Sequence, residues 1–359
     1  MNALSRTERA VIAAVVLLTV LAGLTRYLHG ISEIVAFVCA TLALAGQAWV
    51  VSFSTEQIGR RSGAGLTGVL QSTVGNLPEF FVVLFALQAR DTTVAQTAIL
   101  GSVLVNALLV LGLVLMVGAT RSSDGTMRFN ARLPNDTATL LLAASFMIVL
   151  LGVANSSHDP ASHHAQTISI VGAVAIMAVY ATWMWRYLHD DPPPGMESEE
   201  DTGGRPPLPL AVCLTLLLVA GVGSAFVSDW FVDALEPTIH TLHISQAFAG
   251  LVIVAIAGNA VENVAGIYLA AKGKNELAIS VVKNSVSQIA AFLYPLMVLV
   301  SLLTASRLSF VLDPVYIAAL LGTAVMIWQI TGDGEATPFE GAALVAMFIV
   351  LATIASFQH

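Results

Sequence analysis

Long apolar stretches dominate the sequence, and each is long enough to cross a bilayer as a helix. About 20 apolar residues are needed to span a hydrocarbon core of about 30 Å. Of the 359 residues, 57% are hydrophobic and only 11% are charged, whereas about 25% of the residues in a soluble domain are charged. The sequence therefore predicts an all-α, polytopic membrane protein with eleven transmembrane helices, near 8–28, 31–54, 64–88, 93–119, 134–154, 165–187, 208–228, 243–271, 276–304, 311–330 and 336–357.

Basic residues are unevenly distributed among the loops between these stretches. If the loops alternate between the two sides of the membrane, eleven of the fifteen lysines and arginines fall on the side of the amino terminus and three on the other, with Lys283 inside a stretch. Cytoplasmic loops are enriched in Lys and Arg. The amino terminus is therefore predicted to be cytoplasmic, and the short loops favour the plasma membrane of a bacterium, its inner membrane.

A segment rich in acidic residues, proline and glycine divides the chain. Residues 190–207 contain six acidic side chains, and this composition is typical of a flexible linker. Five stretches before the linker and five after it reverse the orientation of the second half. We therefore expect an N-terminal helix over 1–30, a first five-helix repeat over 31–189, a cytoplasmic linker over 190–207 and a second, inverted repeat over 208–359.

A short motif with a carboxylate occurs once in each half. The sequences GNLPE (75–79) and GNAVE (258–262) are 183 positions apart, and the same shift relates Ser102 to Ser285. A charged side chain at the middle of a membrane helix costs about 2.5–3.5 kcal/mol on insertion scales and usually faces a polar cavity or ion pathway. Inverted repeats with polar interruptions at matched positions are typical of secondary transporters, whose substrate site lies where the repeats meet.

Oxygen-bearing side chains accompany the two motifs. Because each Asn and Glu pair is spaced by three residues, both members share one helix face. Hard cations such as Ca²⁺ take about 6–8 oxygen ligands from carboxylates, amides, main-chain carbonyls and water. We predict a shared cation and proton site with Glu79 and Glu262 as the metal ligands, completed by Asn76, Asn259, Ser102, Ser285, Asn106 and Gln288 and by the backbone at Gly75 and Gly258.

The two halves of this predicted site are not identical. Pro78 removes a backbone donor and crowds the preceding turn, so the first copy is expected to be more distorted than the second, which has no proline. Asn106 aligns with Ile289 in the other half. This mismatch weakens Asn106 as a symmetric ligand.

The glutamates also suggest how transport is coupled. Without a metal ion, a desolvated carboxylate beside a like charge favours its protonated form. Occupancy by a divalent cation or by protons is then mutually exclusive, and alternating access yields exchange. We therefore expect Ca²⁺ and H⁺ as substrates, a lipid bilayer around the protein and no cofactor. The net charge of -8 argues against nucleic acid, and the sequence does not decide between a monomer and a homo-oligomer.

The polar segments resemble those of the calcium/cation antiporter superfamily, specifically its cation/proton (CAX-type) exchangers. The resemblance runs from 54–58 through the first motif to 101–106, and from 235–237 through the second motif to 284–288. It implies that Glu79 and Glu262 are the central ion and proton carriers. The eleven-helix plan with an acidic link after the sixth helix is also similar to that family.

The chain departs from this family at Lys283 and Asn284, where a small or apolar residue followed by glycine is usual. Lys283 has two interpretations. Its ammonium near the carboxylates would neutralise one of them, changing the stoichiometry or favouring a monovalent ion. Alternatively, at roughly 10 Å into its helix, at 1.5 Å per residue, it extends to the cytoplasmic interface.

Other functions remain open from the sequence. The nearest is a Na⁺- or K⁺-coupled exchanger, or a monovalent cation/proton exchanger of the same superfamily. An intramembrane hydrolase would normally need a metal–histidine cluster or two catalytic aspartates, and the apolar stretches contain no histidine cluster. A channel would conduct without coupling, and one site between inverted repeats argues against a ring of pore residues.

Overall fold

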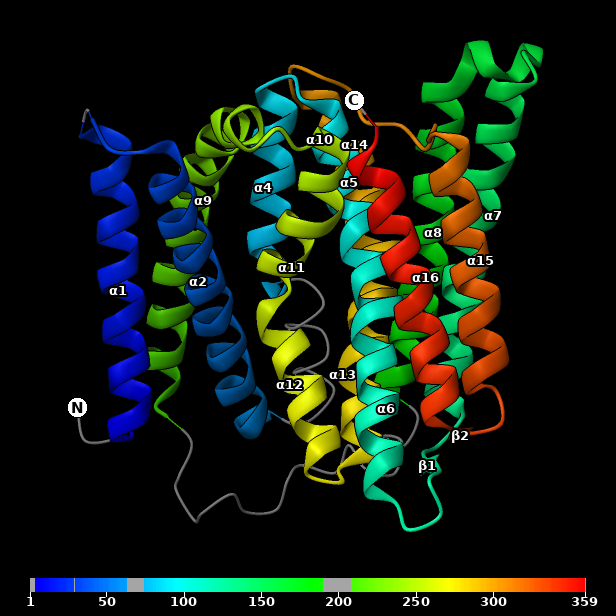
Figure 1. Cartoon of the computed structure of the whole chain (residues 1–359), viewed down its shortest axis with the longest axis horizontal. Coiled ribbons are helices and arrows are strands. Elements are labelled where there is room, and N and C mark those ends of the chain that lie inside the picture. Colours follow the sequence, from blue (N-terminus) through cyan, green and yellow to red (C-terminus); the bar gives the residue numbers. More distant parts are fainter. Residues whose placement is uncertain (1–3, 29, 63–73, 190–207, 359) are drawn as a thin grey trace.

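The computed structural model describes residues 4–28, 30–62, 74–189 and 208–358, without the side chains of 59–62, 133 and 187–189, and most of these residues are helical (Figure 1). Within these ranges, nine helical spans are long and apolar enough to cross a membrane, and one bent pair of helices would make a tenth. The predicted all-α membrane fold is confirmed. The acidic linker predicted over 190–207 lies outside the described residues.

The spans fall into two kinds. Most are built on a single α-helix, and these helices are α1 (Arg6–Tyr27), α2 (Glu33–Ser62), α7 (Arg132–Ser156), α8 (Ala165–His189, after the 3-10 turn η2, Pro160–His164), α9 (Leu210–Leu242), α15 (Pro314–Thr331) and α16 (Pro338–Ser356). Two contain a π-helical segment: α5 (Thr92–Leu104), η1 (Val105–Val110) and α6 (Leu111–Arg121) form one, and α13 (Asn275–Gln288), η4 (Ile289–Leu293), α14 (Tyr294–Val300) and the 3-10 turn η5 (Ser301–Leu303) form the other.

The two motif-bearing segments are broken. In the second half, α10 (Gln246–Phe248), the π-helical η3 (Ala249–Val254) and α11 (Ala255–Gly258) meet α12 (Ala260–Ala271) at an angle of 63°. In the first half, α4 (Leu77–Gln88) is the described end of the span expected over 64–88. Because residues 63–73 are not described, the total of eleven spans stays a prediction.

Helix α9 is longer than expected. The sequence predicted a span ending near 228, but α9 continues to Leu242 and passes Pro237 without ending. That boundary was wrong because the apolar run ends before the helix does. Asp233 in the polar extension pairs with Arg26 at the end of α1, and Thr241 donates to the carboxylate of Glu33 at 3.1 Å. Polar partners on α1 and α2 therefore support the last turns of α9.

The local structure repeats with the same 183-residue shift as the motifs. Helices α4 and α12 both have 12 residues and begin at positions related by this shift; α5 and α13 also begin, and η1 and η4 end, with the same offset. In Figure 1, α4 and α12 extend from the middle of the molecule toward opposite ends. This opposite course favours inverted repeats, which stay a prediction.

The spans that carry the predicted site residues lie at the centre of the bundle. In the most apolar part of Thr92–Arg121, 83% of the residues are buried, against 67% for Asn275–Leu303 and 11% for Arg6–Tyr27. Large apolar side chains such as Leu17 on α1 and Leu218 on α9 are exposed, as expected for helices that face lipid. The site is therefore built on the best-packed part of the molecule.

A short antiparallel ribbon ties helices together at the end opposite the C terminus (Figure 1). Strand β1 (Met127–Arg128) pairs with β2 (Glu335–Ala336). Arg128 bridges Asp124 at 2.7 Å and Glu335 at 3.1 Å, and its hydrogen bond lowers the pKa of the exposed Asp124 carboxyl. The ribbon also reaches α13, because the N–H of Asn130 donates to Glu276 at 2.8 Å.

Candidate functional site

Both motifs form the same local structure, a helix break followed by a new helix. Asn76 has φ −93° and ψ 22°, and Asn259 has φ −96° and ψ 18°. The expectation that Pro78 distorts the first copy more than the second is therefore wrong. The ring of Pro78 lies in the first turn of α4, where a missing N–H removes no helical hydrogen bond. The break is a property of the shared Gly-Asn pair.

Each glutamate lies in the first turn of the helix that follows the break. Helix N-termini present free N–H groups and a partial positive charge that favour an anionic side chain. Glu79 is buried and Glu262 is half-buried, and the two lie close enough for their charges to repel each other. The halves thus bring two carboxylates to one place in the bundle interior.

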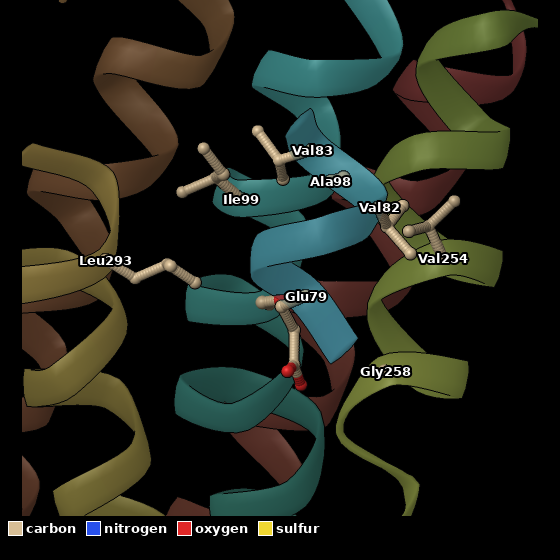
Figure 2. Close-up of a pocket in the computed structure, with 9 residues that line it drawn as sticks. Glu79, Val82, Val83, Ala98, Ile99, Val254, Gly258 and Leu293 are labelled. Atoms are coloured by element: carbon tan, nitrogen blue, oxygen red, sulfur yellow. The ribbon is translucent and has the colours of Figure 1, made fainter. Parts of the chain in front are cut away.

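The Glu79 side chain lies against the backbone of the second motif. A Cβ atom on Gly258 would lie 3.1 Å from Glu79 Cγ and 3.2 Å from its Oε1. Figure 2 shows the carboxylate directed away from the apolar side chains of Val83 and Leu293. The cavity beside it measures only about 10 Å³, and Glu79 Oε2 is buried without a hydrogen-bond partner.

Asn106 is the centre of the polar network that joins the halves. Its Nδ2 donates to the main-chain oxygen of Ser102 at 2.9 Å, to Asn259 Oδ1 at 3.0 Å and to Ser285 Oγ at 3.2 Å. Asn259 Nδ2 donates in turn to Ser102 Oγ at 2.9 Å. All of these side chains are buried, and Asn106 Oδ1 has no partner. The residue without a counterpart in the other half therefore connects both halves of the chain.

The remaining predicted residues lie around this network. Asn76 Nδ2 donates to Gln288 Oε1 at 3.4 Å, which connects the first motif with α13. Gly75 occupies the turn before Asn76, and Asn284 is half-buried on α13. The structure thus brings together side chains from four helices that the sequence placed far apart, and it leaves two buried oxygens, one on Glu79 and one on Asn106, free to accept a cation.

Lys283 fits neither of its two sequence-based interpretations. Its side chain is fully buried, so it does not extend to an interface. Its Nζ donates to Thr331 Oγ1 at 3.0 Å, so it contacts the last residue of α15 rather than a site carboxylate. Helix geometry explains the difference. Ser285 and Gln288 share the face of α13 that turns to the site. Lys283 and Ser287 lie on another face, and the carbonyl of Lys283 accepts a hydrogen bond from Ser287 Oγ at 3.0 Å.

A second, much larger cavity lies at the end of the molecule where the C terminus is found, and we call it the vestibule. Its volume is about 900 Å³, and the ends of α5, α9, α15 and α16 line it together with α10. Polar groups on its walls include Gln96, Thr97, Glu236, His240 and Asp313. Helix α5 continues from this wall to Ala98 and Ser102, which line the small cavity at Glu79.

One close helix crossing, between α5 and η3, lies between the two cavities. A Cβ atom on Gly250 would lie 2.0 Å from Thr97 Oγ1, and one on Gly101 would lie 2.3 Å from the main-chain oxygen of Leu251. Only glycine allows backbones to approach so closely. This α5–η3 crossing involves the stretch of α5 that lines both cavities, and its η3 side is a π-helical segment, a feature often found at functional sites.

Groups of three or more His, Cys, Asp or Glu side chains that could hold a metal ion are absent from the described part of the chain. A cation at the site would therefore be held by two carboxylates together with amide and hydroxyl oxygens. Such an all-oxygen set suits hard cations such as Ca²⁺ rather than zinc or copper.

Comparison with known families agrees with this arrangement. The family model described as "Sodium/calcium exchanger protein" matches residues 32–188 and 212–357, most of both halves. The chain belongs to this sodium/calcium exchanger family. Its members are transporters, and the chain is accordingly a multi-pass membrane transporter rather than an enzyme.

Individual relatives of this exchanger are similar over nearly the whole chain. A vacuolar calcium ion transporter of Schizosaccharomyces pombe is 30% identical over 88% of the chain and 77% of its own length. A Ca²⁺/H⁺ antiporter of Aphanothece halophytica is 27% identical over 94% of the chain and 93% of its own length. The solved structure of native YfkE superposes with a TM-score of 0.79 at 25% identity, covering 97% of this chain and 99% of that one.

Proposed function

We propose that this exchanger moves Ca²⁺ across the membrane in exchange for H⁺, with Glu79 and Glu262 as the shared binding site. The observation that carries the proposal is the pair of buried oxygens without a hydrogen-bond partner, Glu79 Oε2 and Asn106 Oδ1, within a network built from both halves. Buried polar atoms are rarely left unpaired. A transported cation would satisfy both, and the relatives named as calcium transporters support the choice of ion.

The coupling follows from competition for the same carboxylate oxygens. A proton on Glu79 or Glu262 removes the negative charge that a divalent ion needs, and a bound divalent ion displaces the proton. An empty site would leave two neighbouring negative charges in the interior, which is costly in a low dielectric. The site therefore changes sides only when it holds the cation or protons, and this restriction produces exchange.

The amide and hydroxyl groups keep the site assembled both when it binds the cation and when it is protonated. Asn106 and Asn259 bond to each other and to Ser102 and Ser285, so they hold the second break against α5 and α13. Asn76 joins the first break to α13 through Gln288. Asn106 Oδ1 and the serine oxygens complete the coordination of the ion. Gly258 leaves room for the Glu79 carboxylate beside the second motif.

We further propose that the protein lies in the inner membrane of a bacterium with its amino terminus in the cytoplasm, as the basic loops suggest. The vestibule then faces the outside and the β1–β2 ribbon faces the cytoplasm. The closed α5–η3 crossing corresponds to a state in which the outer path to Glu79 is shut.

Ion uptake into liposomes tests the proposal. Purified protein should take up Ca²⁺ under an imposed pH gradient, and Glu79→Gln and Glu262→Gln should each abolish this flux. Glu335→Gln, which changes an exposed acid on the ribbon, serves as the matched control and should keep wild-type flux. Flux of Na⁺ or K⁺ without Ca²⁺ would favour the monovalent alternative, and Ca²⁺ flux that ignores the pH gradient would exclude proton coupling.

A further inference from the structure

Helix α9, which lies outside both motifs, carries a buried hydroxyl on the face that packs against the first turn of α4. Ser224 is completely buried and its Oγ has no hydrogen-bond partner. It lies near the middle of a long apolar helix, where an unsatisfied polar group is costly. Such a group calls for an explanation, because buried hydroxyls in proteins normally find a partner.

Two neighbours on the same face of α9 fix the direction in which Ser224 points. Gly221, three residues before it, approaches Leu77, whose Cδ1 would lie 3.4 Å from a Cβ at that position. Ser228, four residues after it, donates to the main-chain oxygen of Pro78 at 3.4 Å. Residues at these spacings share one helix face. Ser224 is therefore bracketed by contacts to the first turn of α4, the turn that carries Glu79.

The matched helix of the other half has a hydroxyl at the corresponding position. The shift of 183 residues takes Ser224 to Thr41 on α2. Thr41 satisfies its hydroxyl by donating to the main-chain oxygen of Phe37 at 2.7 Å, whereas Ser224 makes no such bond. Of these two matched hydroxyls, only that of Ser224 has no hydrogen-bond partner.

We propose that Ser224 is a further oxygen donor for the transported cation, reaching it directly or through one water of its shell. This inference rests on the proposed function, because it assigns Ser224 to the same site as Glu79. It adds a fifth helix to the four that carry the predicted ligands.

Calcium-dependent thermal unfolding of the full-length protein in detergent separates this role from simple packing. In Ser224→Ala the unfolding temperature without Ca²⁺ should equal or exceed that of the wild type, because the removed hydroxyl had no partner to lose. The Ca²⁺ concentration that gives the half-maximal increase in unfolding temperature should rise by about fivefold, as expected for one lost ligand. Ser224→Thr keeps a hydroxyl and should restore most of the affinity.

Ser145→Ala is the matched control, because Ser145 on α7 is also fully buried with an unpartnered hydroxyl but is absent from the site network. It should leave the Ca²⁺ dependence unchanged. If Ser224→Ala behaves like Ser145→Ala, or lowers the unfolding temperature without Ca²⁺, the proposal is overturned. If Ser224→Ala does not fold, Ser224→Cys replaces it, since a thiol is a poor ligand for a hard cation and should weaken Ca²⁺ binding likewise.

Glu79→Gln in the same titration separates failure of this inference from failure of the proposed function. A wild-type response to Ca²⁺ that disappears in Glu79→Gln supports the site, and the Ser224 variants then decide the inference. No response in the wild type would overturn both.

Discussion

At the scale of single residues, a missing side chain is as important to the site as the charged ones. Gly258 belongs to the second motif, yet the space that it leaves is used by Glu79 of the first motif. The first motif thus depends on the second for the space that its carboxylate occupies. A methyl group at Gly258 would have to displace the carboxylate by a few tenths of an ångström.

The substitution Gly258→Ala should therefore weaken Ca²⁺ transport without unfolding the protein. We expect the apparent Ca²⁺ affinity to fall by about tenfold, or ~1.4 kcal/mol, in the liposome assay. Gly322→Ala on α15 is the control, because nothing lies within 4 Å of a Cβ at that position. Equal affinities for the two variants would show that the Glu79 carboxylate can move aside at no cost.

Lys283 offers a test in which two substitutions change stability in opposite directions. Its amine is fully buried and has Thr331 as its hydrogen-bond partner. An amine in the bundle interior loses its hydration and recovers only one hydrogen bond here, so an apolar side chain of similar size in its place should be neutral or stabilising. Lys283→Met should thus hold or raise the unfolding temperature and keep Ca²⁺/H⁺ exchange.

Thr331→Val should do the reverse, because it removes the partner and leaves the amine buried. A loss of about 1–3 kcal/mol of stability is expected, measured as a lower unfolding temperature of the protein in detergent. Loss of exchange in folded Lys283→Met would instead give the lysine a role in ion selectivity.

These residues also show how far the sequence predicts the site. The repeat of the two motifs was enough to select Glu79, Glu262 and their asparagines, because a carboxylate in an apolar run is rare. Helix periodicity alone could not tell which face of α13 Lys283 occupies. Alignment of the halves understated Asn106, since a residue that bonds to both halves need not be duplicated. Ser224 gave no signal, because a single serine in a membrane helix is common.

At the scale of elements, π-helical segments flank the site in both halves. Segments η1 and η4 follow the site residues of α5 and α13, and η3 precedes the break at Asn259. The sequence does not reveal such segments, because a helix that is apolar on nearly all sides has no periodicity in which one extra residue would show. Their positions indicate where the helices can alter their register at small cost, and η3 takes part in the close crossing with α5.

Widening that crossing should open the vestibule to the site. In a background where Cys39 and Cys213 are replaced by alanine, Ala98→Cys places a thiol beside Glu79, and it should react slowly with a charged, membrane-impermeant thiol reagent. Adding Gly101→Ala, whose Cβ would lie 2.3 Å from the Leu251 oxygen, should raise the rate by about tenfold as the helices separate. Gln96 lines the vestibule, so Gln96→Cys should react quickly with and without Gly101→Ala. An unchanged rate at Ala98→Cys would mean that another contact closes the path.

At the scale of the whole molecule, hydropathy was sufficient for the class of fold but not for the ends of its helices. Apolar length predicts where a helix can cross a membrane, and the described spans agree with those positions. The polar extension of α9 and the ribbon between β1 and β2 depend on contacts between distant segments, such as Arg26 with Asp233. Such contacts have no signature in local composition.

The orientation of the molecule can be decided by labelling opposite ends. Both variants are made in the cysteine-free background. If the amino terminus is cytoplasmic, Ser123→Cys beside the ribbon should react with an impermeant thiol reagent only in inside-out vesicles. Ser162→Cys, in the turn between α7 and α8, should react only in right-side-out vesicles. The reason is the charge of the loops: the ribbon end carries Arg121, Arg128 and Arg132, and retention of basic residues in the cytoplasm fixes topology. Labelling of both positions from one side would contradict the prediction that α7, which lies between them, crosses the membrane once. The reverse pattern would turn the vestibule to the cytoplasm, so that the closed α5–η3 crossing would block the cytoplasmic path to Glu79 rather than the outer one.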